Sequence, residues 1–100
     1  MHSRLEKEIE QKVVDWWETG GGLQLKLNIL GRRGWPDRAF FPYGGSIILI
    51  EFKRVGKDAE ALQAHIHGEL RKRGYRVFIC DSVDQGKAIL ASAKVSEGRC

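Results

Sequence analysis

The first stretch of the chain spaces its apolar residues with the period of about 3.6 residues that an amphipathic helix requires. On a helical wheel one continuous arc holds Leu5, Ile9, Val13, Val14, Trp16 and Trp17. Ser3, with Glu6 three residues later, fits a capping box, and the glycines at 20–22 end the pattern. We therefore expect a helix over residues 3–18.

Two carboxylates interrupt the apolar arc of this helix. Glu6 and Glu10 fall inside the arc, on either side of Trp17. A carboxylate on a buried face costs free energy unless a cation or a metal compensates it. The pattern therefore predicts a compensating group beside this helix.

Four segments have the pattern of β-strands. Residues 23–28 alternate leucines with polar residues, as a half-buried strand does, and residues 37–41 precede a turn signal at 42–45. Residues 46–53 run apolar without alternation until Glu51, which is typical of a central strand covered on both faces. Residues 75–80 form the fourth segment.

Two further helices complete the pattern. One runs over residues 58–73 and ends at Gly74, and its predicted buried stripe is Ala59, Leu62, Ile66 and Leu70. The other begins after an N-cap at Ser82 and runs to about residue 93. The order α-β-β-β-α-β-α predicts an α/β fold, a mixed sheet flanked by helices.

Composition narrows the class of protein. The 100 residues fit one small domain, with a core over about 5–90 and a tail at 94–100 that we expect to fray. Lys and Arg number 17 against 13 Asp and Glu, and this net charge of +4 favours a polyanionic partner. The longest apolar run, 47–50, is far shorter than the roughly 20 residues of a membrane span. We expect a cytoplasmic, reduced protein with no membrane partner.

The candidate chemistry lies where the two middle strands meet. Asp37 opens one strand, and Glu51 and Lys53 end the next, two residues apart and so on the same face. A hairpin closed by the turn at 42–45 brings Asp37 beside Glu51. Paired carboxylates suit a hard cation such as Mg²⁺, and Lys53 can position or deprotonate a water or hold a phosphate.

These residues form a motif with a known counterpart. Pro36 and Asp37, followed by Glu51, Phe52 and Lys53, resemble the PD-(D/E)xK nuclease signature. Further matching positions are Ile9 and Glu10, residues 31–38 (GRRGWPDR), Ile50, Gln63 and residues 74–79. Over about residues 5–90 the chain is similar to the VRR-NUC (virus-type replication-repair nuclease) family, in its stand-alone phage or bacterial form.

The resemblance implies a role for each matching residue. Asp37, Glu51 and the backbone carbonyl of Phe52 would bind Mg²⁺, for which Mn²⁺ substitutes, and Lys53 would be the catalytic lysine. Glu10 would complete the acidic site directly or through water, with Glu6 as the reserve choice. Gln63 would orient Lys53 or the attacking water. No organic cofactor is expected.

Basic residues near the motif are candidates for DNA binding. Arg32 and Arg33 lie on a glycine-flanked loop beside Asp37, where they can grip the phosphate backbone, and Arg54 can extend this basic surface. His65 and His67 lack the i, i+4 spacing of a two-histidine zinc site, but His67 is four residues from Gln63 and can approach the active site. Cys80 fits a buried small hydrophobe.

The resemblance also suggests a substrate. Stand-alone members of the family look like dimeric Holliday-junction resolvases, so we expect a metal-dependent endonuclease that cuts four-way DNA junctions as a homodimer. Interface candidates are Trp16, Trp17 and residues 23–30. One alternative is a nuclease for flaps, nicks or single strands with the same active site. The second is a non-catalytic DNA-binding module, whose binding would persist without metal.

Overall fold

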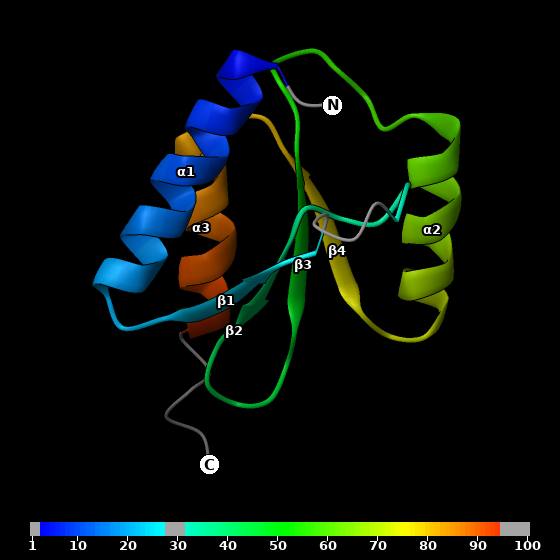
Figure 1. The fold of residues 1–100 in the computed structure, drawn as a ribbon. Helices are drawn as coiled ribbons and strands as arrows, with labels where there is room; N and C mark the ends of the chain where they lie inside the picture. The colour runs from blue at the N-terminus through cyan, green and yellow to red at the C-terminus, as the bar shows by residue number, and fades with distance from the viewer. Residues whose placement is uncertain (1–2, 28–31, 95–100) are drawn as a thin grey trace.

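A computed structural model of the chain describes residues 3–27 and 32–94. Within these residues a four-stranded sheet lies between helices on its two faces (Figure 1). The elements are α1 (Arg4–Thr19), β1 (Leu23–Lys26), β2 (Arg38–Phe41), β3 (Ile48–Phe52), α2 (Ala61–Lys72), β4 (Arg76–Cys80) and α3 (Val83–Lys94). The predicted α/β class and element order are confirmed.

The sheet has the strand order β1-β2-β3-β4. Strand β2 pairs antiparallel with both β1 and β3, whereas β3 and β4 are parallel and connected through α2. All five residues of β3 are buried, as the unbroken apolar run predicts for a central strand. The sheet is therefore mixed, and its most protected strand carries Glu51 at its carboxyl end.

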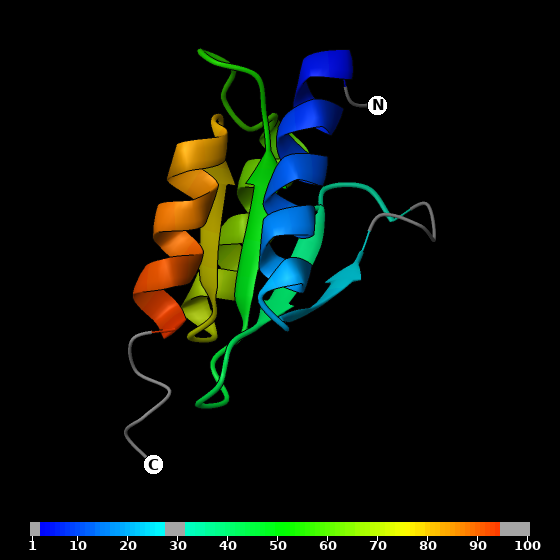
Figure 2. The same cartoon turned by 90° about the vertical axis from the view of Figure 1, so that its left-hand side faces the viewer.

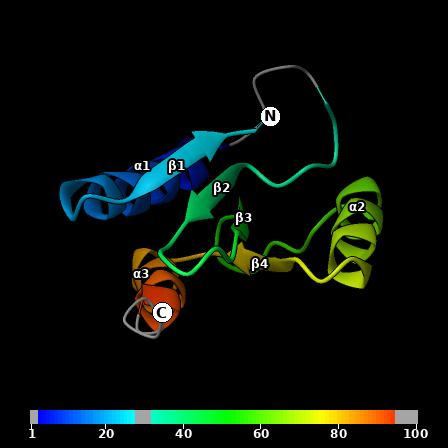
Figure 3. The ribbon, with the colours of Figure 1, turned by 90° about the horizontal axis from the view of Figure 1, so that it is seen from below.

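Each face of the sheet has its own hydrophobic core. Figure 2 shows α1 and α3 side by side on one face, and Figure 3 shows α2 on the other. Ile50 and Phe52 pack with α1 and α3, whereas Leu49 packs with Leu70 of α2. Since side chains alternate along a strand, Glu51 continues the α2 face.

Helix α1 begins and ends as the sequence indicates. The hydroxyl of Ser3 accepts a hydrogen bond from the N–H of Glu6 over 3.2 Å, and Glu6 accepts from the N–H of Ser3 over 3.3 Å. Glu6 and Glu10 are 5% and 6% exposed, so the prediction that both lie on the buried face is confirmed. The same prediction is wrong for Leu5, which is 48% exposed because it lies in the first turn at the edge of the packed surface.

The strands are shorter than the sequence pattern suggests. The strand expected over 46–53 begins only at Ile48, and the one expected over 37–41 begins at Arg38. Asp37 still donates its N–H to the carbonyl of Ile50 over 3.0 Å, so it continues the pairing of β2 with β3. Asn28, predicted to end the first strand, lies outside the described residues, as do residues 95–100 of the predicted tail.

The buried face of α2 differs from the predicted stripe. The helix begins at Ala61 rather than near residue 58, and Leu62 is 46% exposed, whereas His67 is only 1% exposed. The reason is the position of the helix, which turns His67 toward the polar end of β3 while Leu62 lies under the loop at Gly34. Periodicity alone does not reveal which part of the sheet a helix covers.

Two remaining expectations concern Cys80 and the membrane. Cys80 is fully buried in the core, and burial raises the pKa of its thiol, so it is a packing residue as predicted. Among residues 3–27 and 32–94, no helix has the length and apolar character that crossing a bilayer requires.

Candidate active site

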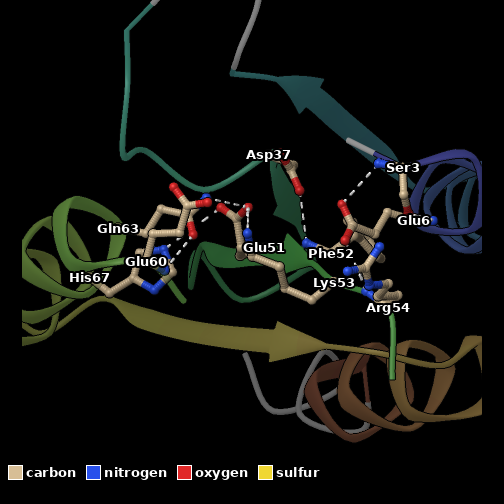
Figure 4. Close-up of polar contacts among 10 residues, drawn as sticks. All are labelled: Ser3, Glu6, Asp37, Glu51, Phe52, Lys53, Arg54, Glu60, Gln63 and His67. Carbon is tan, nitrogen blue, oxygen red and sulfur yellow. Dashed lines mark hydrogen bonds and ion pairs between the residues drawn. The ribbon is translucent and has the colours of Figure 1, made fainter. Parts of the chain in front are cut away.

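Asp37 is held in place from three directions. Its N–H donates to the carbonyl of Ile50, and its carbonyl accepts from the N–H of Leu27 over 2.8 Å. Its side-chain Oδ2 accepts from the backbone N–H of Phe52, also over 2.8 Å (Figure 4). Only 2% of Asp37 is exposed, and the preceding Pro36 is buried as well. The aspartate is therefore fixed at the junction of three strands.

Glu51 and Lys53 meet Asp37 at the carboxyl end of β3. Glu51 is 1% exposed and Lys53 is 6% exposed, and the ammonium Nζ lies 3.8 Å from Glu51 Oε2. The register pairs Arg38 with Ile50, so Asp37, one residue earlier, lies opposite Glu51. The predicted convergence of two carboxylates beside a lysine is present in the structure.

Gln63 joins this group from the first turn of α2. Its amide Oε1 accepts from the N–H of Glu60, which caps the helix, and its Nε2 donates to Glu51 Oε2 over 2.9 Å. Because the cap takes the amide oxygen, the NH₂ group is the one directed at the carboxylate. Gln63 lines the site as predicted, but it contacts Glu51 rather than Lys53.

His67 follows Gln63 by one helical turn, and the sequence predicts only that it can approach the active site. Its Nε2 lies 3.8 Å from Glu51 Oε1 (Figure 4). The i, i+4 relation to Gln63 was the available signal, since it puts both side chains on one face of the helix. His65, by contrast, is exposed.

The two buried glutamates of α1 have different partners. Glu10 forms an ion pair with Arg38, which also donates to Gln24 Oε1 over 2.9 Å. Glu6 accepts from the backbone N–H of Arg54 over 3.2 Å, one residue beyond Lys53. The compensating cation expected for this helix is therefore present at Glu10, while Glu6 is fixed to the end of β3.

The loop before Asp37 approaches α2 closely. Gly34 has φ +87°, and a Cβ there would lie 2.8 Å from Leu62 Cγ and 3.0 Å from Ile66 Cγ1, so only glycine fits without a shift. Arg32 and Arg33, which precede it, are exposed, and so is Arg54. Gly31 lies outside the described residues. Exposed basic side chains thus lie on the loop that leads to Asp37 and directly after Lys53.

The donor atoms at this site suit a hard divalent cation. Within residues 3–27 and 32–94, no group of three His, Cys, Asp or Glu side chains forms a complete metal cage. Mg²⁺ does not require one, because it is usually held by one or two carboxylates and keeps several waters. Asp37 and Glu51, with the carbonyl of Phe52 on the strand edge that faces Asp37, fit this requirement.

Comparisons with known proteins agree with this geometry. No family model matches the sequence. The chain is 35% identical over 79 residues to the "Putative nuclease p44" of Acyrthosiphon pisum secondary endosymbiont phage 1, a match covering 79% of this chain and 85% of the relative. A solved structure described as "VRR_NUC domain" superposes with a TM-score of 0.77 at 29% identity, over 89% of this chain and 97% of the other. The chain belongs to the VRR-NUC family of nucleases.

Proposed function

We propose that this nuclease is a metal-dependent endonuclease that hydrolyses phosphodiester bonds in branched DNA. The observation that carries the proposal is the convergence of Asp37 and Glu51, two buried carboxylates from neighbouring strands, beside the buried Lys53. Burying a charged group destabilises the folded protein. Three buried charged groups gathered at the end of one strand are therefore typical of a catalytic site.

In this proposal Asp37, Glu51 and the Phe52 carbonyl hold Mg²⁺ or Mn²⁺. When bound, the metal supplies Lewis acidity and a more acidic water at the phosphate. Lys53 contacts the attacking water or the phosphate, since its ammonium is held beside Glu51 and cannot itself bind a cation. Gln63 fixes Glu51 through the hydrogen bond to Oε2.

The contribution of α1 to the acidic site has two candidates. The first candidate is Glu10, which the sequence resemblance places in the acidic site. Because Glu10 is paired with Arg38, its role in this proposal is to contact the metal through a water. Glu6 has an equal claim, because its carboxylate binds the N–H of Arg54 at the end of the strand that carries Glu51 and Lys53. Conservative variants of each glutamate distinguish the two.

DNA contacts are assigned to the exposed basic residues around the site. Arg32 and Arg33 lie on the loop that leads into Asp37, and Arg54 directly follows Lys53. Guanidinium groups bind phosphate oxygens well, and exposed positions keep them available to a long polyanion. These contacts position the backbone of DNA and carry no sequence preference.

A four-way junction cut by a homodimer is the substrate that we propose. One chain offers one active site and cuts one strand, whereas a junction has two-fold character and requires two matched sites. Edge strand β1 supplies apolar surface for such a dimer, since Leu23 and Leu25 are 72% and 53% exposed. Trp17 does not contribute to that surface, because it is 4% exposed and donates its indole N–H to the carbonyl of Leu23.

The test is a cleavage assay on a junction with a mobile core, with linear duplex and flap substrates as controls. Paired nicks on opposing strands, together with a dimeric mass in solution, would support the proposal. Cutting of flaps with the junction left intact would favour the flap or single-strand nuclease. DNA binding that persists without metal, and no cutting of any substrate, would favour a non-catalytic module.

A further inference from the structure

His67 is a polar side chain buried inside the protein. It is 1% exposed, and neither Nδ1 nor Nε2 has a hydrogen-bond partner among the described residues. Buried polar groups are nearly always hydrogen-bonded, so an exception calls for an explanation such as a catalytic role. Packing alone does not explain the histidine, because leucine would fill a similar volume without burying polar atoms that lack hydrogen bonds.

The position of His67 supplies the explanation. Gln63 and His67 lie one turn apart on α2, and each faces a different oxygen of Glu51 (Figure 4). Gln63 Nε2 lies 2.9 Å from Oε2, and His67 Nε2 lies 3.8 Å from Oε1. The two side chains therefore approach the two oxygens of the carboxylate from one face of the helix.

We propose that His67 is a positioning residue which, together with Gln63, orients the carboxylate of Glu51 for cation binding. This inference rests on the proposed function, in which Glu51 is a metal ligand. A distance of 3.8 Å exceeds a hydrogen bond, but contacts in an active site without its substrate are often long and tighten in the complex. Carboxylates that bind metals are characteristically held by such outer partners.

The experiment measures Mn²⁺ affinity without DNA, from the electron paramagnetic resonance signal of free Mn²⁺, together with thermal unfolding. The variants are His67→Leu, which keeps the volume, and His67→Gln, which keeps an N–H donor. His65→Gln is the matched control, because His65 is exposed on the same helix. We expect H67L to bind Mn²⁺ about 10–100-fold more weakly, the range typical for removal of an outer partner.

The stability readout separates positioning from packing. We expect H67L to unfold at the wild-type temperature or above it, because an apolar side chain replaces a buried polar one. H67Q should recover most of the Mn²⁺ affinity, and H65Q should match the wild type in both measurements. A loss of affinity without a loss of stability would be the signature of a positioning residue.

Three results would overturn the inference. They are wild-type Mn²⁺ affinity in H67L, an equal loss in H67L and H67Q, and nitrogen hyperfine coupling from His67 to bound Mn²⁺, which would make it a direct ligand. If H67L does not fold, His67→Met takes its place, because methionine also removes the ring nitrogens; weaker Mn²⁺ binding in H67M than in H67Q supports the inference, and wild-type affinity in H67M overturns it. A wild-type protein that binds no Mn²⁺ would instead contradict the proposed function itself.

Discussion

The backbone N–H of Phe52 donates a hydrogen bond to Oδ2 of Asp37 over 2.8 Å, which joins the motif aspartate to the strand that carries Glu51 and Lys53. The N–H and C=O groups of one strand residue point to the same edge, so the Phe52 carbonyl also lies on the side of Asp37. The N–H of Arg54, two residues later, donates to Glu6. Oxygen atoms from three parts of the chain thus gather along this edge of β3.

Replacing Lys53 by methionine should separate chemistry from metal binding. Lys53→Met keeps the length of the side chain and removes its charge, so cleavage should fall by about 10²–10⁴-fold, the contribution typical of a positioned proton-transfer group. Mn²⁺ affinity should stay the same or rise, because a cation next to Glu51 is removed. Single-turnover cleavage and Mn²⁺ titration measure the two effects.

The matched control for this variant is Lys57→Met, since Lys57 is exposed in the following loop. K57M should cut DNA like the wild type. A K53M protein that retains wild-type cleavage would remove Lys53 from the mechanism.

Removing one partner of the ion pair between Glu10 and Arg38 should destabilise the protein at the α1 interface. Their side chains are 7% and 12% exposed, so Arg38→Met would leave a buried carboxylate without its cation and cost about 3–5 kcal/mol. The double variant Glu10→Met/Arg38→Met should recover most of that loss. Urea unfolding of both single variants and the double variant measures the coupling.

Variants of both glutamates bear on the acidic site of α1. Additive losses, with no recovery in the double variant, would contradict a coupled pair. The cleavage rate of Glu10→Gln, compared with that of Glu6→Gln, indicates which glutamate the reaction needs.

Much of this arrangement can be predicted from the sequence, and the rest depends on tertiary packing. The burial of Glu6 and Glu10 follows from the helical wheel, because the wheel reports which face a residue occupies. The helical wheel does not reveal that Arg38 is the partner of Glu10, because the two residues are 28 positions apart in the sequence. Likewise, the helical wheel of α2 does not show whether Leu62 or His67 is buried. The position of the helix against the sheet decides this, and it buries His67.

Gly34 should be more sensitive to substitution than a glycine in an open turn. Gly34→Ala meets both an unfavourable φ of +87° and side-chain atoms of α2, and we expect a loss of about 1–3 kcal/mol in the free energy of unfolding. Gly44→Ala is the control, because it has φ +102° with nothing within 4 Å of the added Cβ.

The difference between the unfolding free energies of G34A and G44A measures how much the close contact between the loop and α2 contributes. G34A should be the less stable of the two and should also cut DNA more slowly, because the loop leads into Asp37. Equal stabilities would show that the approach to Leu62 and Ile66 contributes nothing.

Arg32 and Arg33 should contribute to the affinity for DNA and not to a preference for any DNA sequence. The double variant Arg32→Gln/Arg33→Gln should weaken binding to all DNA substrates and reduce the slope of log K against log salt by about 1 for each phosphate that the protein no longer neutralises. Binding titrations at several salt concentrations measure this slope. Arg4→Gln, at an exposed position of α1, is the control, and a slope unchanged in the double variant would exclude both arginines from the interface.

The central claim is that Asp37 and Glu51 hold a divalent cation for phosphodiester hydrolysis, and a Mg²⁺ titration of junction cleavage tests it most directly. Asp37→Asn keeps an oxygen for the N–H of Phe52 but removes the charge, so it should fold normally and cut at least about 100-fold more slowly at every Mg²⁺ concentration. Wild type and Asp58→Asn, an exposed control, should cut with Mg²⁺ and stop in EDTA. Cleavage that continues in EDTA, or a wild-type rate in D37N, would contradict the account.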